Sequence, residues 1–404
     1  MAKRAFVVTF LAMSWLALAA AAVSAADDKN TRVATWAIGA AAGGRSFQAQ
    51  TVRMVVHPSA SGRAPRLRLS NLYSTGPLNI AHATLSVQSK AATLQPGSLH
   101  ALTVGGKTSF TIPAGSEIWT DPVPMRVAAG QNLAVSLYLP ETTAASTWHQ
   151  DAFETTYATM PGAGDHATDI NDDAFKPIGT SWYYVSAMTV EATGSRTVVA
   201  FGDSITDGYK TPVSANARWP DVLSRRLVAA GKPVAVANVG IGGNRLLTDG
   251  PDPARGISAL HRFDHDVLSL PNVRTVILLE GINDIGADAG PDGRVLTAAD
   301  LIDGYRQLIR QARRAGVRII GATILPSEGS GYFSETREAT RQAANTWIRT
   351  SGAFDGVVDF DKAVRDPQHP RRLLPLYDAG DHLHPNAAGM QAMGESIDLH
   401  LPGL

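Results

Sequence analysis

The sequence predicts an all-β sandwich followed by an α/β domain built on a doubly wound parallel sheet. The chain has 404 residues, which is more than one hydrophobic core usually supports. Residues 33–192 alternate apolar and polar side chains, whereas the chain from residue 197 onward forms short apolar segments separated by helical patterns. The pattern of apolar and polar residues changes near residues 193–196, so we expect domains at 27–195 and 196–404.

The alternation in the first domain is typical of antiparallel strands. Apolar side chains recur at every second position in four segments, residues 51–56, 66–71, 133–139 and 184–191. A period of two with one polar face predicts half-buried strands. Glycine, proline and serine interrupt the pattern about every dozen residues, which suits the turns of a sandwich.

The second domain contains five apolar segments that read as buried strands, residues 197–201, 234–239, 275–280, 318–324 and 356–360. The clearest helix between them begins at Thr297, which forms a capping-box pattern with Asp300, and stops at Gly316. Strands buried on both faces and alternating with helices predict a parallel sheet covered on both sides. Such sheets bind ligands at the carboxyl ends of their strands.

Charge and cysteine content narrow the classes of function. Lysine and arginine together number 36, as do aspartate and glutamate, so net charge gives no basis for nucleic-acid binding or for attraction to anionic membranes. The chain has no cysteine, which excludes disulfides, thiolate metal sites and a cysteine nucleophile. The sequence does not indicate an oligomeric state.

Residues 1–26 predict a secretory signal peptide. Lys3 and Arg4 precede an apolar run, and small residues follow it, with cleavage expected after Ala25 or Ala26. An uncleaved membrane anchor is the alternative. No later stretch is apolar enough to span a membrane. We therefore expect a secreted or periplasmic protein without stable membrane insertion after cleavage.

Polar residues gather where the predicted parallel strands end. Ser204 follows the first strand in the sequence GDSIT, a glycine-rich GIGGN follows the second at residues 240–244, and Asn283 follows the third in GIND. Asp381 and His384 lie in DHLHP, before the final helical segment. The carboxyl ends of parallel strands share one edge of the sheet, so we expect these residues to meet there.

These residue types are the ones that acyl transfer to a serine requires. A serine hydroxyl becomes a good nucleophile when a neutral imidazole takes its proton. The imidazole in turn needs a carboxylate on its other nitrogen, and Asp381 and His384, three residues apart, can supply these two groups. Glycine lets backbone N–H groups approach an oxyanion closely, and the amide of Asn283 can supply a further N–H.

In these four blocks the sequence resembles the SGNH hydrolase superfamily, also called the GDSL-like lipases/acylhydrolases. GDSIT, GIGGN, GIND and DHLHP occur in the family's order within residues 197–400. The resemblance implies a flavodoxin-like α/β/α fold. It also implies a catalytic triad of Ser204, Asp381 and His384.

The same resemblance implies three donors to the oxyanion. They are the backbone N–H groups of Ser204 and Gly243 and the side-chain amide of Asn283. Gly240 and Gly242 are alternatives to Gly243, because all three glycines lie in one short loop. The residue after the serine is isoleucine where the family often has leucine, which is a conservative departure.

The sequence contains partial matches to motifs of other functional classes, and each of the first two is excluded by one residue. Thr206 stands where the nucleophile elbow of an α/β-hydrolase has glycine, and Arg245 breaks a dinucleotide-binding glycine pattern. The acidic loop at residues 169–173 is expected to be solvated, with an irregular Ca²⁺ site as the alternative.

Several histidines and aspartates in this domain are expected to have structural roles and not catalytic or metal-binding ones. His382 is expected to be exposed, and His261 and His265 are expected to lie on a surface helix face, so we predict no metal site. Asp203 and Asp284 flank the predicted site and are expected to stabilise turns by accepting hydrogen bonds from nearby backbone N–H groups.

The sequence as a whole predicts a serine esterase that forms an acyl-serine intermediate and needs no cofactor. Secreted members of the superfamily with an additional β-domain resemble carbohydrate esterases, so we expect the partner to be an acylated carbohydrate that loses acetyl groups. A lipase or arylesterase acting on longer acyl esters is the alternative among enzymes. A glycan-binding protein with minor esterase activity is the alternative from another class.

Two aromatic residues, Tyr332 and Phe333, are candidates for contact with the sugar or acyl group, because they lie in a polar loop after a predicted strand. The β-domain either binds glycan by itself or helps to shape the active site. The sequence leaves both roles open, together with the acyl chain length, the alcohol moiety and the regioselectivity.

Overall fold

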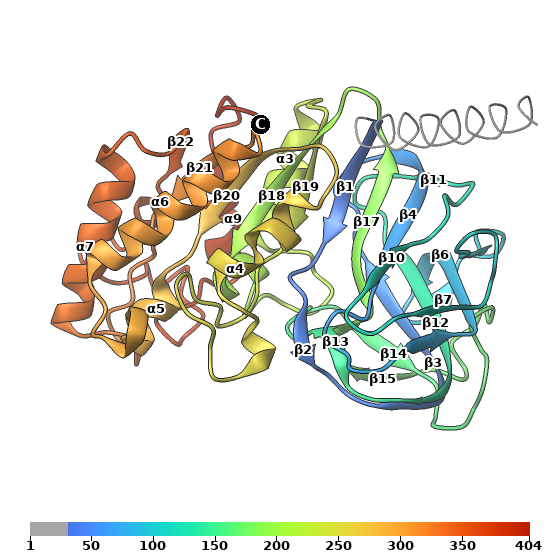
Figure 1. Ribbon diagram of the computed structural model, residues 1–404. Coiled ribbons are helices and arrows are strands. Elements are labelled where there is room, and N and C mark those ends of the chain that lie inside the picture. The colour runs from blue at the N-terminus through green and yellow to red at the C-terminus, as the bar shows by residue number, and fades with distance from the viewer. Residues whose placement is uncertain (1–30) are drawn as a thin grey trace, which may run out of the picture.

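The computed structural model describes residues 31–404, and the predicted signal peptide at residues 1–26 lies outside the described residues. The chain forms two halves that lie side by side, one built of β-strands and one of alternating strands and helices (Figure 1). No helix within residues 31–404 is both long and apolar enough to cross a membrane.

In the first half, two large antiparallel sheets contribute to one hydrophobic core, which is the arrangement of a sandwich. The first sheet contains, in order, β1 (Arg32–Ala37), β17 (Val185–Glu191), β4 (Gly62–Ser70) and β10 (Glu117–Trp119), with β11 (Arg126–Val127) also paired to β4. The second contains, in order, β15 (Lys176–Gly179), β14 (Thr156–Ala158), β3 (Phe47–Val56), β12 (Leu133–Thr143), β6 (His82–Lys90) and β7 (Thr93–Leu94), with β8 (His100–Ala101) paired to β6. Smaller sheets consist of β16 (Trp182–Tyr183), β13 (Ser146–His149) and β2 (Ala41–Gly43), and of β5 (Leu78–Ile80) and β9 (Phe110–Ile112).

Strand β3 differs from the half-buried strand that its alternation predicts. Its Arg53 is 0% exposed, although it occupies a polar position of the pattern. The guanidinium donates to the Oγ of Ser136 (2.9 Å) and to the carbonyl of Asp169 (2.8 Å), and its Cζ lies 4.0 Å from the centroid of the Phe175 ring. The acidic loop therefore belongs to a segment that covers this face of the sheet, which a strand's own periodicity cannot reveal.

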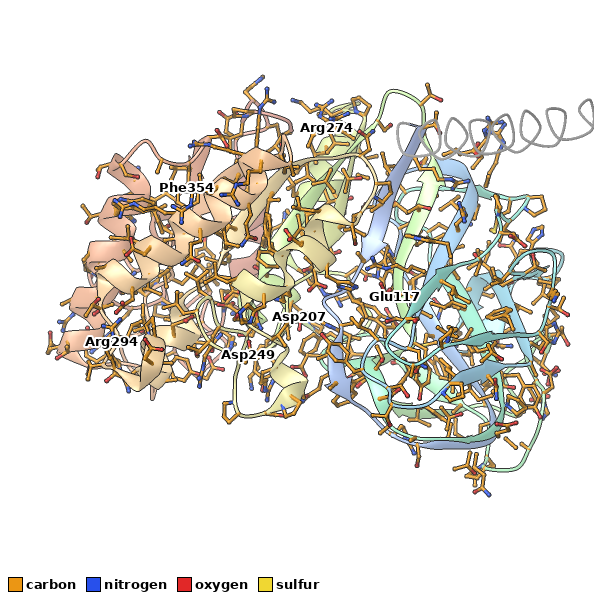
Figure 2. The ribbon with its side chains drawn as sticks, in the orientation of Figure 1. Glu117, Asp207, Asp249, Arg274, Arg294 and Phe354 are labelled. Atoms are coloured by element: carbon orange, nitrogen blue, oxygen red, sulfur yellow. The ribbon has the colours of Figure 1, made fainter. Side chains whose placement is uncertain are left out.

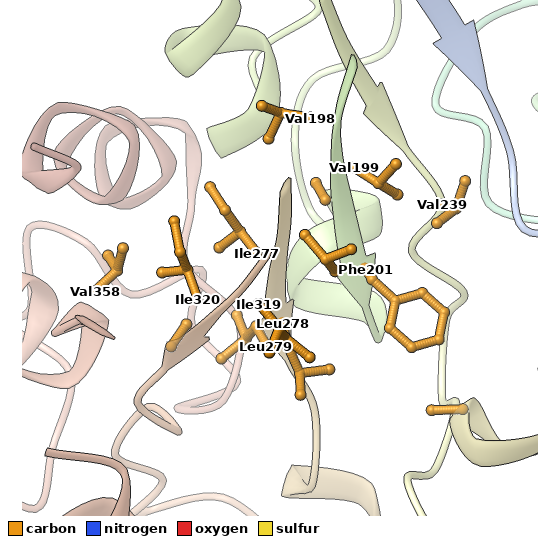
Figure 3. Close-up of a cluster of buried hydrophobic side chains, with 14 of the residues drawn as sticks. Val198, Val199, Phe201, Val239, Ile277, Leu278, Leu279, Ile319, Ile320 and Val358 are labelled. Atoms are coloured by element: carbon orange, nitrogen blue, oxygen red, sulfur yellow. The ribbon is translucent and has the colours of Figure 1, made fainter. Parts of the chain in front are cut away.

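In the second half, five strands pair in parallel in the order β19 (Val234–Asn238), β18 (Arg196–Gly202), β20 (Val273–Leu279), β21 (Arg318–Ala322) and β22 (Gly356–Val358). Counted along the chain this order is 2-1-3-4-5, as in flavodoxin-like sheets. Apolar side chains such as Val199, Ile277 and Ile320 fill the core around these strands (Figure 3). The order reverses beside β18, and ligands bind at such a switch point, at the carboxyl ends of the strands.

The helices of the second half fall into two groups of mutual contacts. One group contains α3 (Trp219–Ala229), α8 (Phe360–Val364) and α9 (Ala387–Ser396). The other contains α4 (Ala259–Phe263), α5 (Ile282–Ala287), α6 (Ala298–Arg314) and α7 (Glu335–Thr350). Helix α6 begins with the predicted capping box, in which Thr297 Oγ1 accepts a hydrogen bond from the N–H of Asp300 (3.3 Å) and the Asp300 carboxylate accepts one from the N–H of Thr297 (2.9 Å).

Hydrogen bonds join the two halves along their interface. Strand β1 lies beside β19 (Figure 1), and Ala34 donates its N–H to the Oγ1 of Thr197 (3.0 Å). Ser59 bonds to two elements of the other half: its Oγ accepts from the N–H of Val236 (2.9 Å), and its carbonyl accepts from the Oγ of Ser224 (3.0 Å). The β-rich half therefore packs directly on the edge of the parallel sheet.

Candidate active site

Ser204 is held at a sharp turn directly after β18. It opens the single-turn helix α2 (Ser204–Asp207), whose N-cap is Asp203. The Asp203 carboxylate accepts a hydrogen bond from the N–H of Ile205 (2.9 Å), which confirms the turn-stabilising role expected for it. Gly208 closes the turn with a φ of 100° and donates its N–H to the carbonyl of Ser204 (2.9 Å). A buried strand thus delivers the serine to the carboxyl edge of the sheet.

The predicted serine, histidine and aspartate form one hydrogen-bonded chain. The Oγ of Ser204 lies 2.9 Å from Nε2 of His384, and Nδ1 of His384 lies 2.9 Å from Oδ2 of Asp381. The other carboxylate oxygen of Asp381 accepts hydrogen bonds from the backbone N–H groups of Leu383 (3.1 Å) and His384 (2.9 Å). These bonds fix the carboxylate in the turn before α9, so that it can orient the imidazole.

The electrostatics around His384 favour its neutral form. Burial lowers the pKa of His384 below its ordinary value, because an imidazolium would lose hydration, and this effect outweighs the opposing influence of Asp381. The ammonium of Lys210 lowers this pKa further. Burial by itself raises the pKa of Asp381, but hydrogen bonds from His384 outweigh burial and leave the pKa lower than usual. A neutral imidazole next to an ionised carboxylate can accept the serine proton.

Asn283 lies at the start of α5, after β20, with its amide orientation fixed from both ends. Its Nδ2 donates to the carbonyl of Asn244 (2.8 Å), and its Oδ1 accepts from the hydroxyl of Tyr332 (3.2 Å). Nδ2 therefore keeps one N–H that has no acceptor within residues 31–404. A Cβ on Gly286 would lie 2.1 Å from the Tyr332 ring, so a glycine is needed there for the tyrosine to reach the amide.

The GIGGN loop supplies further backbone donors. Gly242 and Gly243 line the same cavity as Ser204 and Asn283, and the N–H of Gly243 finds no acceptor within the described residues. The N–H of Gly240 is already bonded to the Oδ1 of Asn238 (2.9 Å). A Cβ on Gly240 would lie 2.4 Å from the nitrogen of Asp207, so this glycine permits close packing against the nucleophile turn.

A cavity of about 440 Å³ opens beside the serine. Its lining includes Ser204, His384, Tyr209, Tyr332 and Leu383, together with charged residues on two loops. The Tyr209 ring lies 4.6 Å from the imidazole of His384, centroid to centroid. The structure therefore places Tyr332, predicted to contact substrate, at the cavity and also in contact with Asn283.

Phe333 lies apart from this cavity. The guanidinium of Arg371 stacks over its ring, with 5.2 Å from Cζ to the ring centroid, and Phe333 is absent from the cavity lining. The two adjacent aromatic residues thus have different surroundings, since Tyr332 bonds to Asn283 whereas the Phe333 ring contacts Arg371.

Arg262 is a buried residue of this site that sequence reasoning missed. Its guanidinium donates to the carbonyls of Gly202 (2.8 Å) and Val239 (2.7 Å) and to the Oδ1 of Asn244 (2.8 Å). It also pairs with Glu280 (3.4 Å). One arginine thereby ties together the ends of three strands and the glycine loop. Its one local partner is Asp266, four residues later (3.0 Å), and all its other partners lie in distant segments that a local sequence pattern cannot reveal.

Asp284 bonds to a more distant segment than expected. Its two carboxylate oxygens accept hydrogen bonds from the N–H groups of Leu246 (2.8 Å) and Leu247 (3.0 Å), which follow the glycine loop. The residue thus braces that loop against α5. Burial raises the pKa of Asp284 to about 7, and burial likewise raises that of Asp203 to about 7.

The three other histidines named above separate into two kinds. His382 and His261 are exposed, as predicted. His382 pairs with Asp378 (2.6 Å), and His261 pairs with Asp249 (3.2 Å). The prediction for His265 was wrong. Its ring bridges Asp266 (2.7 Å) and Glu117 of the β-rich half (2.9 Å), because the two halves of the chain meet at the helical turn Asp264–Leu268 that follows α4. The described residues contain no group of three or more side chains arranged to hold a metal ion.

Known proteins resemble part of this chain. Residues 200–392 match the model of the GDSL-like lipase/acylhydrolase family. No curated protein was found to match the sequence. Similar solved structures include a lipolytic protein of the G-D-S-L family from Desulfitobacterium hafniense DCB-2 (22% identity, TM-score 0.39, 50% of this chain and 97% of that one). They also include the aryl esterase of M. smegmatis, with 17% identity and a TM-score of 0.41 over 50% of this chain and 96% of that one. A carbohydrate acetylesterase from Sinorhizobium meliloti matches with 16% identity and a TM-score of 0.40 over 50% of this chain and 96% of that one.

The family match spans all four sequence blocks, GDSIT, GIGGN, GIND and DHLHP, and each block contributes at least one residue to the cavity beside Ser204. It begins inside β18 and ends inside α9, so the strand that delivers the serine and the turn that carries the histidine both lie within it. Residues 200–392 therefore form a domain of the GDSL-like lipase/acylhydrolase family, and the chain is a carboxylic ester hydrolase.

Proposed function

We propose that Ser204, His384 and Asp381 are the catalytic triad of this esterase. The observation that carries the proposal is the unbroken chain of two 2.9 Å contacts from the serine oxygen through the imidazole to the carboxylate. His384 Nε2 takes the Ser204 proton while Oγ attacks the ester carbonyl. Asp381 holds Nδ1–H and stabilises the imidazolium that results.

The developing oxyanion is stabilised by three N–H groups. We assign these to the backbone of Ser204, the backbone of Gly243 and the amide of Asn283, because all three residues line one cavity and keep an N–H without an acceptor in the described chain. Gly242 meets the same two criteria and stays the alternative to Gly243. When the intermediate collapses, His384 gives its proton to the departing alcohol and an acyl-serine remains. A water molecule, activated by the same imidazole, then hydrolyses the acyl-serine. None of these steps draws on a metal ion or a cofactor.

The substrate that the cavity supports best is a short acyl ester of a carbohydrate. Polar and charged side chains of Gln150, Asp151, Arg245, Asp252 and Arg255 line it. A long acyl chain laid against these groups would remove their hydration without replacing their hydrogen bonds, which is costly. A hydroxyl-rich alcohol would replace those bonds. We further propose that residues 1–26 direct export, so that the enzyme meets its substrate outside the cytoplasm.

Ester hydrolysis by wild-type protein and Ser204→Ala tests the proposal. We expect Ser204→Ala to lose about 10⁶-fold in kcat with an unchanged melting temperature, because the hydroxyl acts in chemistry and not in packing. Ser396→Ala, at the end of α9, is the matched control and should keep full activity. A folded Ser204→Ala variant with near-normal turnover would overturn the triad.

The choice of substrates tests the acyl and alcohol parts separately. Hydrolysis of p-nitrophenyl acetate, butyrate and palmitate is compared with release of acetate from acetylated xylan. We expect activity to fall with chain length and acetate to be released from the polysaccharide. Preference for the palmitate would instead show a lipase, and activity on aryl esters alone would show an arylesterase.

A further inference from the structure

A short segment of the β-rich half, residues 149–154, reaches into the active site of the other half. Two of its side chains, Gln150 and Asp151, line the cavity that also contains Ser204 and His384. A third, Phe153, packs edge-on against Tyr209 (5.8 Å between centroids), the ring next to the imidazole. The junction of the two halves, marked by Asp207 in Figure 2, therefore lies at the site itself.

The segment is fixed at both of its ends. His149 Nδ1 lies 2.8 Å from the carbonyl of Gly39, and its Nε2 lies 2.9 Å from the Oδ1 of Asp207, three residues after the serine. Beyond the cavity, the carbonyl of Phe153 accepts from the N–H of Ser214 (2.8 Å), and the guanidinium of Arg218 donates to the carbonyl of Ala152. These hydrogen bonds on either side fix Gln150 and Asp151 in place at the cavity.

The glycine loop is shaped to admit Asp151. A Cβ on Gly242 would lie 2.4 Å from the Oδ2 of Asp151, so any larger residue at 242 would displace that carboxylate. The same oxygen lies 3.5 Å from Nη1 of Arg255, a long contact. The other carboxylate oxygen makes no hydrogen bond within residues 31–404.

Three polar side chains at the cavity therefore have unused hydrogen-bonding capacity. They are the free oxygen of Asp151, the amide of Gln150 and the guanidinium of Arg245, which makes no hydrogen bond or ion pair in the described chain. Together they offer an acceptor, an amide that both donates and accepts, and a forked donor. This combination matches a surface of adjacent hydroxyl groups.

We infer that Gln150 and Asp151 of the β-rich half, together with Arg245 at the same cavity, bind hydroxyl groups of the alcohol part of the ester and so select polyhydroxylated alcohols. The inference rests on the proposed esterase function and deepens it by naming these specificity-determining residues. A site built to hydrogen-bond hydroxyls discriminates against an alcohol that lacks them, because its own polar groups then stay unpaired. The β-rich half is on this account part of the substrate site.

The test compares two acetyl esters that differ in the alcohol. Full-length wild type, Gln150→Ala, Asp151→Ala and Asp151→Asn are assayed with an acetylated xylo-oligosaccharide and with p-nitrophenyl acetate, whose leaving group has no hydroxyl. We expect each alanine variant to lose about tenfold in kcat/KM on the saccharide ester, through KM, and to stay within about twofold on p-nitrophenyl acetate. Free xylobiose should inhibit the wild type competitively and inhibit Asp151→Ala more weakly.

Asp165→Ala is the matched control, since Asp165 is another ion-paired aspartate of the β-rich half (2.9 Å to His82) and does not line the cavity. It should leave both activities unchanged. Equal losses on both esters, or no loss on either, would overturn the inference while the esterase function stands. A wild type that hydrolyses p-nitrophenyl acetate but no saccharide ester would overturn the carbohydrate substrate and this inference together. A wild type inactive on every ester would overturn the proposed function itself.

Discussion

Two histidine–aspartate pairs contact the nucleophile turn, one through Ser204 and one through Asp207, and have opposite electrostatics. In each, an imidazole nitrogen lies 2.9 Å from a carboxylate oxygen. His384 borders the cavity, and burial lowers its pKa. For His149, burial by itself lowers the pKa, but Asp207 and the carbonyl of Gly39 outweigh burial and raise it.

The partner of the second ring nitrogen explains the difference. His384 has the Ser204 hydroxyl on Nε2, and a hydroxyl can donate to a neutral imidazole. His149 has the carbonyl of Gly39 on Nδ1, which only accepts, so Nδ1 must carry a proton while Nε2 faces a carboxylate. That environment favours the imidazolium. The same two residue types therefore make a proton acceptor in one place and, in the other, a buried pair between the two halves that favours a protonated imidazole.

Removing the first imidazole should give the largest effect. His384→Ala should lower kcat by about 10⁶-fold, because among residues 31–404 only the His384 imidazole bonds to the serine hydroxyl. Its melting temperature should hardly change, since the side chain borders the cavity. His382→Ala, two residues away and exposed, is the control and should retain activity. If His384→Ala kept appreciable turnover while His382→Ala lost it, the two histidines would have to exchange roles.

Replacing Asn283 should have a different effect from replacing either His384 or His149, because Asn283 is proposed to donate a hydrogen bond to the oxyanion. Asn283→Ala should lower kcat by about 10²- to 10³-fold with little change in KM. Tyr332→Phe, which removes the hydrogen bond that orients the amide, should give a smaller loss of about tenfold. Steady-state kinetics on p-nitrophenyl acetate measure both. A large rise in KM with normal kcat would make Asn283 a substrate-binding group.

Removing the second imidazole should affect stability more than chemistry. His149→Ala leaves the Asp207 carboxylate buried without its partner, which costs about 3–5 kcal/mol of unfolding free energy. We expect a loss of about tenfold in kcat from the folded protein, because the turn that carries Ser204 is less well held. The control is His82→Ala, whose pair with Asp165 is partly exposed.

The pH dependence of stability checks the assignment of charge to His149. Its pKa is raised on folding, so its stabilisation is complete below the unfolded value of about 6.5 and is lost as pH rises through the folded pKa. Urea unfolding of wild type and His149→Ala from pH 5 to 9 should show the gap between them narrowing at alkaline pH. A gap that widens with pH would contradict an imidazolium at this position.

The smallest effect expected is a shift of the acidic limb of activity. His384 must be neutral to act as a base, so kcat/KM rises with pH, and the lowered pKa places this limb below the ordinary value of 6.5. Asp381→Asn removes the charge that favours the imidazolium and should move the limb lower still. Asn283→Ala should lower kcat/KM by the same factor at every pH and leave the midpoint of the acidic limb where it is. A limb that stays in place in Asp381→Asn would mean that Asp381 does not act on His384.

The catalytic residues were predictable because their signals are local. Asp381 and His384 are three residues apart, and Ser204 and Asn283 each follow directly after an apolar strand, so order along the chain fixes their place in a parallel sheet. The prediction failed for residues whose partners are distant. His265 pairs with Glu117, and the buried Arg53 lies under a loop that begins more than a hundred residues later.

The same reasoning explains why the role of the β-rich half could not be predicted. Gln150 and Asp151 belong to an unremarkable polar stretch, and only the position of His149 against Asp207 brings them to the serine. A strand pattern specifies which face of a strand is apolar, but it does not specify which other domain that strand will meet. Contacts between domains depend on shape, which single-sequence periodicity does not encode.

Gly242 has a consequence for how such enzymes evolve. Because a side chain at 242 would collide with the carboxylate of Asp151, the loop of one half and the segment of the other have to change in step. A hydrolase without the β-rich half is free of that restriction at the matching loop position. Among relatives, we expect aspartate at 151 to occur together with glycine at 242. In genome sequences, the joint presence of these two residues would then distinguish fused enzymes from single-domain ones.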